Sequence, residues 1–289
     1  MIYFLLFIQQ FIASLTHIVG KDALETLSPS LALLLRALIA SVSLFIVVAV
    51  KQKRLNLFYG IERKDYLRFA LLGLLNIPLN QFIYFEGLHQ TSPANSALLY
   101  AMTPAIVFVL VLIMHGERAN WKKTIGILIA FGGSAIVMFE HGATFDSAYT
   151  KGNILIFIAV TAWSLFTILG KPLIPKYGAL RVTAIHMLFG TILFLPIGLA
   201  NADLSVIPTM SGSIWLEVFY LGLIASCVNY ILWYYALGRL ETSKVAIFQN
   251  LQPILTTIIA LTLGTVFLTP ILAGGGALAL LGVLLVEKG

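Results

Sequence analysis

The sequence has few charged residues. Only 10% of its 289 residues are charged, 60% are hydrophobic, and the mean hydropathy is +0.97. Soluble domains carry about 25% charged residues, so we exclude a soluble globular protein and predict a chain that lies in a bilayer. A helix needs about 20 mostly apolar residues to cross the hydrocarbon core. The ten stretches that meet this need are residues 2–20, 30–50, 66–86, 92–114, 122–139, 152–171, 180–199, 212–235, 243–265 and 270–286.

Cysteine and catalytic motifs are also scarce. The single cysteine, Cys227, lies in a predicted span, cannot form an internal disulfide and is expected to be a packing residue. The sequence has no H-E-x-x-H, no G-x-S-x-G and no cluster of Asp and Glu that would hold a metal. We therefore expect no catalytic residue, metal or cofactor. Buried His, Asn and Tyr leave an intramembrane enzyme as a less favoured alternative.

The formal net charge of +6 is unevenly placed. Of the 18 Lys and Arg residues, 15 lie on one side of the predicted bundle if both termini share that side, whereas Lys21 and Lys151 lie in loops on the other and Arg36 lies inside a span. By the positive-inside rule, both termini are expected in the cytoplasm. This placement argues against nucleic-acid binding. Anionic lipid is the expected neighbour of the basic loop at residues 51–64.

Two segments of similar sequence lie 149 residues apart: YFEGLHQTSPANSALLYAMTP at residues 84–104 and WYYALGRLETSKVAIFQNLQP at residues 233–253. The same offset relates Asn80 to Asn229 and Gly133 to Gly282. Each copy holds five predicted spans, and an odd number of crossings leaves the second copy upside down relative to the first. We therefore predict an all-α integral membrane protein: ten transmembrane helices as two inverted five-helix repeats, residues 1–142 and 150–289, around a central cavity.

Polar and aromatic side chains enter the predicted spans at helical spacing. Because polar groups are costly in a bilayer, side chains that recur every three or four residues on one face indicate a pathway, as Gln10, Ser14 and His17 do in the first span. Any single amide can also serve as interhelical hydrogen-bond glue worth about 1 kcal/mol, and any single aromatic as a packing or interface residue. Together the stripes predict a substrate-binding site of Asn80, Tyr84, Tyr100, Trp163, Asn229, Trp233 and Gln249.

Four ionisable residues complete the predicted site. Arg36 lies roughly two turns inside one end of its span, where an unpaired guanidinium costs several kcal/mol, and Glu86 is its expected partner. We hypothesise that this pair closes the outer exit and separates during transport, which a double-mutant cycle without coupling would refute; a structural ion pair is the alternative. His17 and His186 allow proton coupling, although a hydrogen-bonded structural histidine is the commoner case. The sequence alone does not establish proton coupling, since no Asp occupies the centre of a span.

The fifth and tenth spans differ from the others because they carry small residues instead of polar stripes. Gly126, Ala130 and Gly133 in the fifth correspond to Gly275, Ala279 and Gly282 in the tenth. Small residues four apart let helices approach closely. We expect these spans to pack at the periphery or to make a subunit contact, so a homo-oligomer stays open.

The segments at residues 84–104 and at residues 115–133, HGERANWKKTIGILIAFGG, resemble the EamA-like module of the drug/metabolite transporter superfamily. The likeness lies in an Ala-rich fourth helix with an internal proline, a Gly-Glu-Arg turn and a Gly-rich fifth helix. It covers essentially the whole chain and is specific for the superfamily but weak for the substrate. The second half departs from the family pattern at one turn. Residues 116–118 are Gly-Glu-Arg, but the aligned residues 265–267 are Thr-Val-Phe, where this family often has a second Glu.

The resemblance implies movement of small metabolites, often amino acids outward across the bacterial inner membrane, and it extends to aromatic amino acid exporters of the YddG type. We expect a secondary transporter, an exporter or facilitator of amino acids or related metabolites, that works by alternating access at a central site. A drug cation, a nucleotide sugar or a lipid-linked group is the alternative cargo. A cation calls for a central acid and a nucleotide sugar for several basic groups, and neither is evident. A structural or receptor-like protein would be favoured if Asn80, Tyr100 and Trp163 faced lipid.

Overall fold

The structure, a computed structural model, describes residues 1–53, 56–115, 121–140, 143–144, 146–262 and 269–288. Arg54 and the two aligned turns at residues 116–118 and 265–267 lie outside the described residues. Within the described ranges the chain is helical and forms no strand. A bilayer favours this result, because a helix satisfies its backbone hydrogen bonds within one segment.

Eight described helices are long and apolar enough to cross a membrane, and each overlaps a predicted span. They are Ile2–Thr26, Pro29–Gln52, Pro93–Met114, Trp121–Glu140, Ser147–Tyr177, Ala179–Asn201, Gly212–Leu237 and Pro270–Lys288. The chain is therefore a multi-span membrane protein. The other two predicted spans, 66–86 and 243–265, fall on further helices. The first is less apolar because it carries Asn76, Asn80 and Gln81, and residues 263–265 lie outside the described part of the second.

The helices of the first half are α1 (Ile2–Thr26), α2 (Pro29–Gln52), α3 (Arg63–Leu74), η1 (Leu75–Phe82), α4 (Ile83–His89), α5 (Pro93–Tyr100), α6 (Thr103–His115) and α7 (Trp121–Glu140). Those of the second half are η2 (Ser147–Tyr149), α8 (Thr150–Gly170), η3 (Lys171–Leu173), α9 (Ile174–Tyr177), α10 (Ala179–Asn201), η4 (Leu204–Thr209), α11 (Gly212–Phe219), η5 (Tyr220–Val228), α12 (Asn229–Leu237), α13 (Thr242–Ala246), η6 (Ile247–Asn250), α14 (Leu251–Thr262) and α15 (Pro270–Lys288). Several of these segments follow one another without a break. For example, α3, η1 and α4 form one continuous helix.

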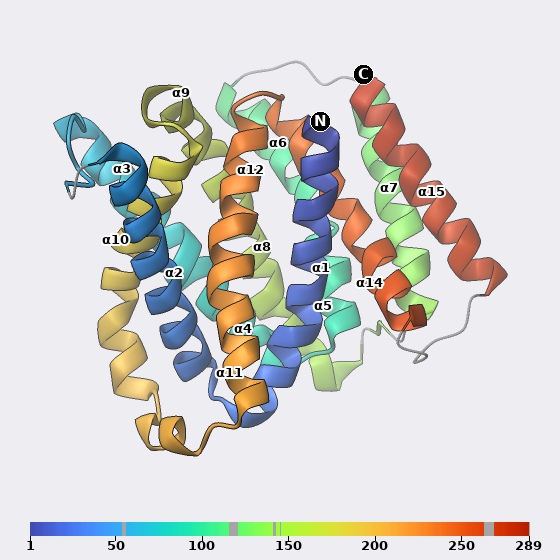
Figure 1. Ribbon diagram of the computed structural model, residues 1–289. Coiled ribbons are helices and arrows are strands. Elements are labelled where there is room, and N and C mark those ends of the chain that lie inside the picture. The colour runs from blue at the N-terminus through green and yellow to red at the C-terminus, as the bar shows by residue number, and fades with distance from the viewer. Residues whose placement is uncertain (54–55, 116–120, 141–142, 145, 263–268, 289) are drawn as a thin grey trace.

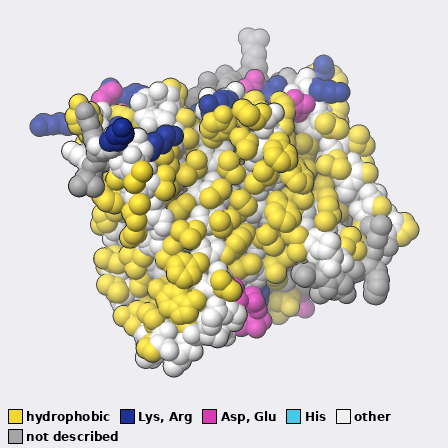
Figure 2. All heavy atoms as spheres, viewed as in Figure 1, with side chains coloured by type: hydrophobic (Ala, Val, Ile, Leu, Met, Phe, Trp, Pro, Cys, Tyr) yellow, Lys and Arg dark blue, Asp and Glu magenta, His cyan; other side chains and the backbone are white. Residues whose placement is uncertain are grey.

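The helices stand side by side, with α2 and α10 at one edge, α1, α8 and α12 in the middle, and α7 and α15 at the other edge (Figure 1). Both chain termini lie at the same end of the bundle (Figure 1). The flank seen in Figure 2 is largely apolar, and most of its Lys and Arg side chains gather at the end that carries the termini. An apolar band with basic residues at one rim is typical of a protein that crosses a bilayer.

Two continuous helices contain a π-helical segment in their middle. These segments are η1, between α3 and α4, and η5, between α11 and α12. Pro78 lies inside η1 and has no N–H to donate, so a regular helix could not continue through it unchanged. A π turn holds an extra residue and therefore rotates all that follows by about 100°. These segments and the turns directly after them carry polar residues of the central cavity.

Helices α7 and α15 pack against each other through their glycines. A Cβ atom on Gly133 would clash with the backbone nitrogen of Ala279, and one on Gly282 with that of Ala130. The helices can approach this closely only because these positions lack side chains. They lie at one edge of the bundle, away from its centre (Figure 1).

Candidate functional site

A cavity of about 70 Å³ lies inside the bundle, between residues from both halves of the chain. Its lining is Gln9, Ala13, Thr16 and His17 of α1, Arg36 of α2, Asn80 and Gln81 of η1, Tyr84 of α4, Tyr100 of α5, Trp163 of α8, Ala225 of η5, Asn229 and Tyr230 of α12, Gln249 of η6 and Gln252 of α14. Ligand sites for small molecules usually measure about 300–1,000 Å³. The cavity in this structure therefore admits a few waters, and it must widen to hold a metabolite.

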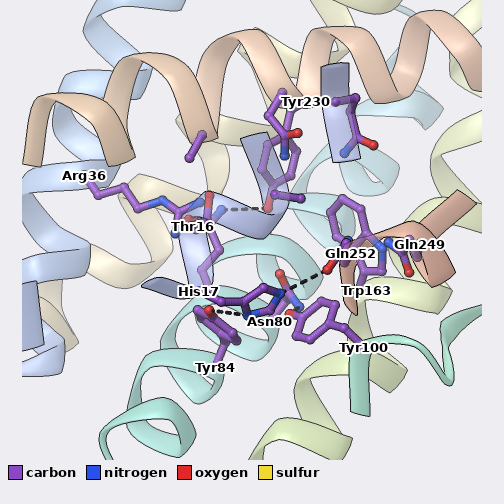
Figure 3. Close-up of a pocket in the computed structure, with 15 residues that line it drawn as sticks. Thr16, His17, Arg36, Asn80, Tyr84, Tyr100, Trp163, Tyr230, Gln249 and Gln252 are labelled. Atoms are coloured by element: carbon purple, nitrogen blue, oxygen red, sulfur yellow. Dashed lines mark hydrogen bonds between the residues drawn. The ribbon is translucent and has the colours of Figure 1, made fainter. Parts of the chain in front are cut away.

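A chain of side-chain hydrogen bonds centred on His17 joins four helices (Figure 3). Gln252 Nε2 donates to Gln10 Oε1 over 2.8 Å, so Gln252 Oε1 is left to accept from His17 Nε2 at 3.0 Å. His17 Nδ1 lies 2.9 Å from the Tyr84 hydroxyl and 3.1 Å from Ser96 Oγ. This network places the proton of a neutral ring on Nε2, with Nδ1 as acceptor. His17 is thus fully hydrogen-bonded and positions the residues around it.

A second chain of hydrogen bonds runs away from the cavity to His186. Tyr230 OH accepts from Gln81 Nε2 at 3.2 Å, and the same nitrogen lies 3.1 Å from Asn76 Oδ1. Asn76 Nδ2 lies 3.3 Å from His186 Nδ1. His186 is fully buried between aromatic rings, with that of Phe166 at 4.9 Å, and it does not line the cavity. Its place behind Tyr230 supports packing and orientation, not contact with a ligand.

Three buried polar atoms in the cavity wall have no hydrogen-bond partner among the described residues. They are Trp163 Nε1, Asn229 Oδ1 and Gln249 Oε1, on side chains of residues that are 5%, 7% and 1% exposed. A buried polar group without a partner costs about 1–3 kcal/mol. All three belong to the second half of the chain. Asn80, the repeat-related counterpart of Asn229, differs because its amide nitrogen donates to Tyr100 OH and to Ala159 O at 2.8 and 2.9 Å. The indole of Trp163 and the amide oxygens of Asn229 and Gln249 are therefore available to bind polar groups.

The expected ion pair between Arg36 and Glu86 is absent from the described structure. Arg36 Nε instead donates to Ser226 Oγ over 2.6 Å, and the guanidinium lies 5.5 Å from the centre of the Phe85 ring. Successive residues of a helix point about 100° apart, so α4 directs fully buried Phe85 toward Arg36 and turns half-buried Glu86 elsewhere. The prediction rested on the depth of the two residues near the ends of their spans, and depth does not fix the side of α4 on which Glu86 lies.

Six of the seven predicted binding residues line the cavity, and Trp233 does not. The Trp233 ring is fully buried, packs against that of Trp163 with ring centres 5.3 Å apart and planes tilted by 39°, and donates from Nε1 to Thr167 Oγ1 over 3.2 Å. Trp233 therefore lies behind the cavity wall and supports Trp163, and the prediction that it lines the cavity is corrected.

Sequence reasoning missed Gln9, Thr16 and Ser226. Gln9 and Thr16 line the cavity on the same face of α1 as Ala13, at offsets of four and three, so helical spacing gave a usable signal. Ser226 was hidden within an apolar run of η5. Nothing in the sequence singles it out as the partner of Arg36.

Comparisons with known proteins identify a family, relatives and a shared fold. The family model described as the EamA-like transporter family matches residues 1–139 and 150–287. An uncharacterized transporter of Bacillus subtilis, YetK, is 30% identical over 248 residues, which are 84% of this chain and 73% of the relative. A probable terminal-alkyne amino-acid exporter of Streptantibioticus cattleyicolor is 27% identical over 233 residues, 79% of this chain and 76% of that protein. A protein of known crystal structure shares the fold, with a TM-score of 0.80, 19% identity and coverage of 99% and 97% of the two chains.

Proposed function

The chain belongs to the EamA-like transporter family, and we propose that it moves amino acids or related small metabolites through the central cavity by alternating access. The observation that carries this is the set of three buried, unpartnered atoms on Trp163, Asn229 and Gln249, residues that line one cavity. An indole N–H and two amide groups offer both donors and acceptors. A ligand that bonds them recovers their burial penalty.

The mixture of rings and amides supports an amino acid as cargo. Trp163 and Tyr230, with ring centres 5.4 Å apart in an edge-to-face arrangement, form an apolar wall against which a side chain can pack. The amides can orient polar ends of the same molecule. An amino-acid exporter among the relatives, at 27% identity, is in keeping with this class.

We also propose that ten spans form two inverted five-helix repeats, residues 1–142 and 150–289. Ser41 Oγ lies 2.8 Å from Thr191 Oγ1, and Gln81 Nε2 donates to Tyr230 OH. The members of these pairs are 150 and 149 residues apart, the offset of the sequence repeat. A residue that touches its own repeat partner lies on a two-fold axis.

Reciprocal contacts away from that axis support the same relation. The hydrogen bond between Tyr84 and His17 in the first half corresponds, at the same offsets, to the one between Trp233 and Thr167 in the second. An axis in the membrane plane would make the two ends of the cavity open by equivalent movements. This geometry supports alternating access.

The bacterial inner membrane, with both termini in the cytoplasm, is the proposed location. Both termini (Figure 1) lie at the end where Lys and Arg side chains gather (Figure 2), and basic residues favour the cytoplasmic side. The amino-acid exporter among the relatives, at 27% identity, supports outward movement.

Efflux from vesicles containing the purified protein tests the proposed function. A panel of amino acids and small metabolites is loaded, and loss of each is compared with that from protein-free vesicles. We expect at least one amino acid to leave faster, and Gln249→Leu to slow it by about tenfold, since one hydrogen bond to a charged group is worth about 1.5–3 kcal/mol. The matched control is Leu128→Ala, which changes an exposed residue of α7. Folded protein that moves no member of the panel would contradict the proposal.

A further inference from the structure

Arg36 is the one charged residue that lines the cavity as described, apart from the titratable ring of His17. The lining contains no Asp or Glu. Arg36 lies seven residues beyond the start of α2 at Pro29, about 10 Å along the helix, and it is only 4% exposed. A fixed positive charge therefore stands at a place where the protein supplies no counter-ion.

The surroundings of Arg36 hold the guanidinium without neutralising it. A guanidinium has five N–H donors, of which Nε is used by Ser226 Oγ at 2.6 Å. Phe85 offers the face of its ring at 5.5 Å. Among the described residues, no hydrogen bond or ion pair engages either Nη atom, so four donors remain.

We propose that Arg36 receives the carboxylate of the substrate and makes the cavity selective for acids, an inference that rests on the proposed function. The planar guanidinium fork matches a carboxylate, which can accept two parallel hydrogen bonds from it. Ser226 fixes the fork by holding Nε. Arg36 is therefore a specificity-determining residue and not half of a gate with Glu86.

The cavity presents different chemistry at its two ends. In Figure 3, Arg36 enters from one side, whereas Trp163 and Gln249 lie on the opposite side, with His17 and Asn80 between them. A carboxylate at Arg36 thus leaves the rest of the molecule to meet the indole and the amides. Amines without an acid group are disfavoured, because they meet a positive charge with no acid nearby.

Competition with matched compounds tests the role of Arg36. Efflux of a transported amino acid is inhibited by the unlabelled amino acid, by its primary amide and by the amine that lacks the carboxyl group. The wild-type protein should favour the acid over the other two by at least about tenfold, as sites built around a polar group reject analogues that lack it. In Arg36→Gln this preference should fall to about one, and in Arg36→Lys it should be intermediate.

Two further measurements separate this role from a structural one. Size-exclusion profiles and melting temperatures show whether the variants fold, and the comparison of acid with amide in the wild-type protein tests selectivity even if Arg36→Gln does not fold. Ser226→Ala, which frees Nε, should lower the acid preference without abolishing transport. Equal inhibition by acid and amide, or an unchanged preference in folded Arg36→Gln, would overturn this inference alone. Failure of the wild-type protein to move any amino acid would overturn the proposed function and this inference with it.

Discussion

Trp163 and Trp233 show how similar side chains acquire different tasks from their partners. The two rings are in contact, yet the N–H of Trp233 donates to Thr167 and that of Trp163 has no partner among the described residues. Trp163 is therefore available to a ligand, and Trp233 maintains its position. The distinction depends on single atoms and is invisible in the sequence, where both are aromatic residues on polar faces.

We expect Trp163→Phe and Trp233→Phe to have opposite effects although they remove similar volumes. Trp163→Phe deletes a buried unpartnered donor, so the melting temperature without substrate should be unchanged or higher, while KM for transport rises by about tenfold. Trp233→Phe breaks a buried hydrogen bond and should destabilise the protein by about 1–3 kcal/mol. Thermal unfolding and efflux kinetics measure both effects. A lower melting temperature for Trp163→Phe with unchanged KM would contradict its assignment to the binding wall.

Asp65 provides a pH prediction outside the predicted spans. Its side chain is buried in the first turn of α3 and accepts from Arg68 Nη1 at 3.0 Å, Lys176 Nζ at 2.9 Å and Tyr177 OH at 2.9 Å. Burial by itself raises the pKa of Asp65, but the hydrogen bonds from Lys176 and Tyr177 outweigh it and hold the pKa below its ordinary value. The ionised form is therefore stabilised by folding.

Asp65→Asn should lower the melting temperature at pH 7. A depressed pKa in the folded state gives stabilisation that is present above the unfolded value, near 4, and is lost as the pH falls through the folded value. The difference between wild type and variant should thus be constant from pH 6 to about 8 and shrink below pH about 4. Melting curves across this range check it, and a difference that grew on acidification would contradict the sign.

At the scale of helices, close packing of α7 and α15 depends on particular glycines. A Cβ on Gly133 would meet the backbone of α15, whereas one on the neighbouring Gly132 would meet nothing within 4 Å. The small residues at spacings of four and three predicted close helix packing at the periphery or in a subunit contact. The structure adds that these two helices pack against each other.

Gly133→Ala and Gly132→Ala form a matched pair on one helix. Gly133→Ala forces the helices apart and should destabilise the protein by about 1–3 kcal/mol. Gly132→Ala should be neutral or stabilising by up to about 1 kcal/mol, because alanine has the higher helix propensity. Thermal unfolding of both variants in the same detergent measures the contrast. Equal effects would show that this contact does not govern the packing.

Local helical spacing set the limit of prediction from sequence. It brought Asn80 and Asn229 correctly to one cavity, since each continues a polar face along its own helix. It did not distinguish Trp233 from Asn229, although both lie on α12, because a residue of the cavity wall and a residue packed behind that wall can share a helical face. The pairing of Arg36 with Glu86 rested on depth in the bilayer, and depth does not fix the side of a helix on which a residue lies.

At the scale of the whole molecule, two lysines lie at repeat-related positions near the proposed ends of the pathway. Lys21 Nζ donates to the carbonyl oxygens of Leu88 and Thr91 at 2.9 and 3.0 Å, and Lys171 Nζ donates to that of Leu240 at 2.6 Å. Thr91 and Leu240 are 149 residues apart, so the contacts are equivalent in the two halves. Positive charge near the carbonyl end of a helix is stabilising.

Substitution of these lysines should loosen opposite ends of the bundle. We expect Lys21→Met to increase access to the cavity from outside and Lys171→Met to increase it from the cytoplasm, each by several-fold. The rate at which impermeant reagents label a cavity cysteine from each side measures this. The same shift for both variants would contradict the inverted arrangement of the two halves.

Labelling of a single cysteine at position 249 tests most directly whether substrate crosses through the cavity by alternating access. The background is Cys227→Ala, which removes the single native thiol, and Phe4→Cys on the exposed face of α1 is the control. We predict that impermeant thiol reagents reach position 249 from either side of the membrane and that a transported amino acid slows this labelling but not that of the control. A position reached from neither side, or labelled equally with and without substrate, would contradict the account.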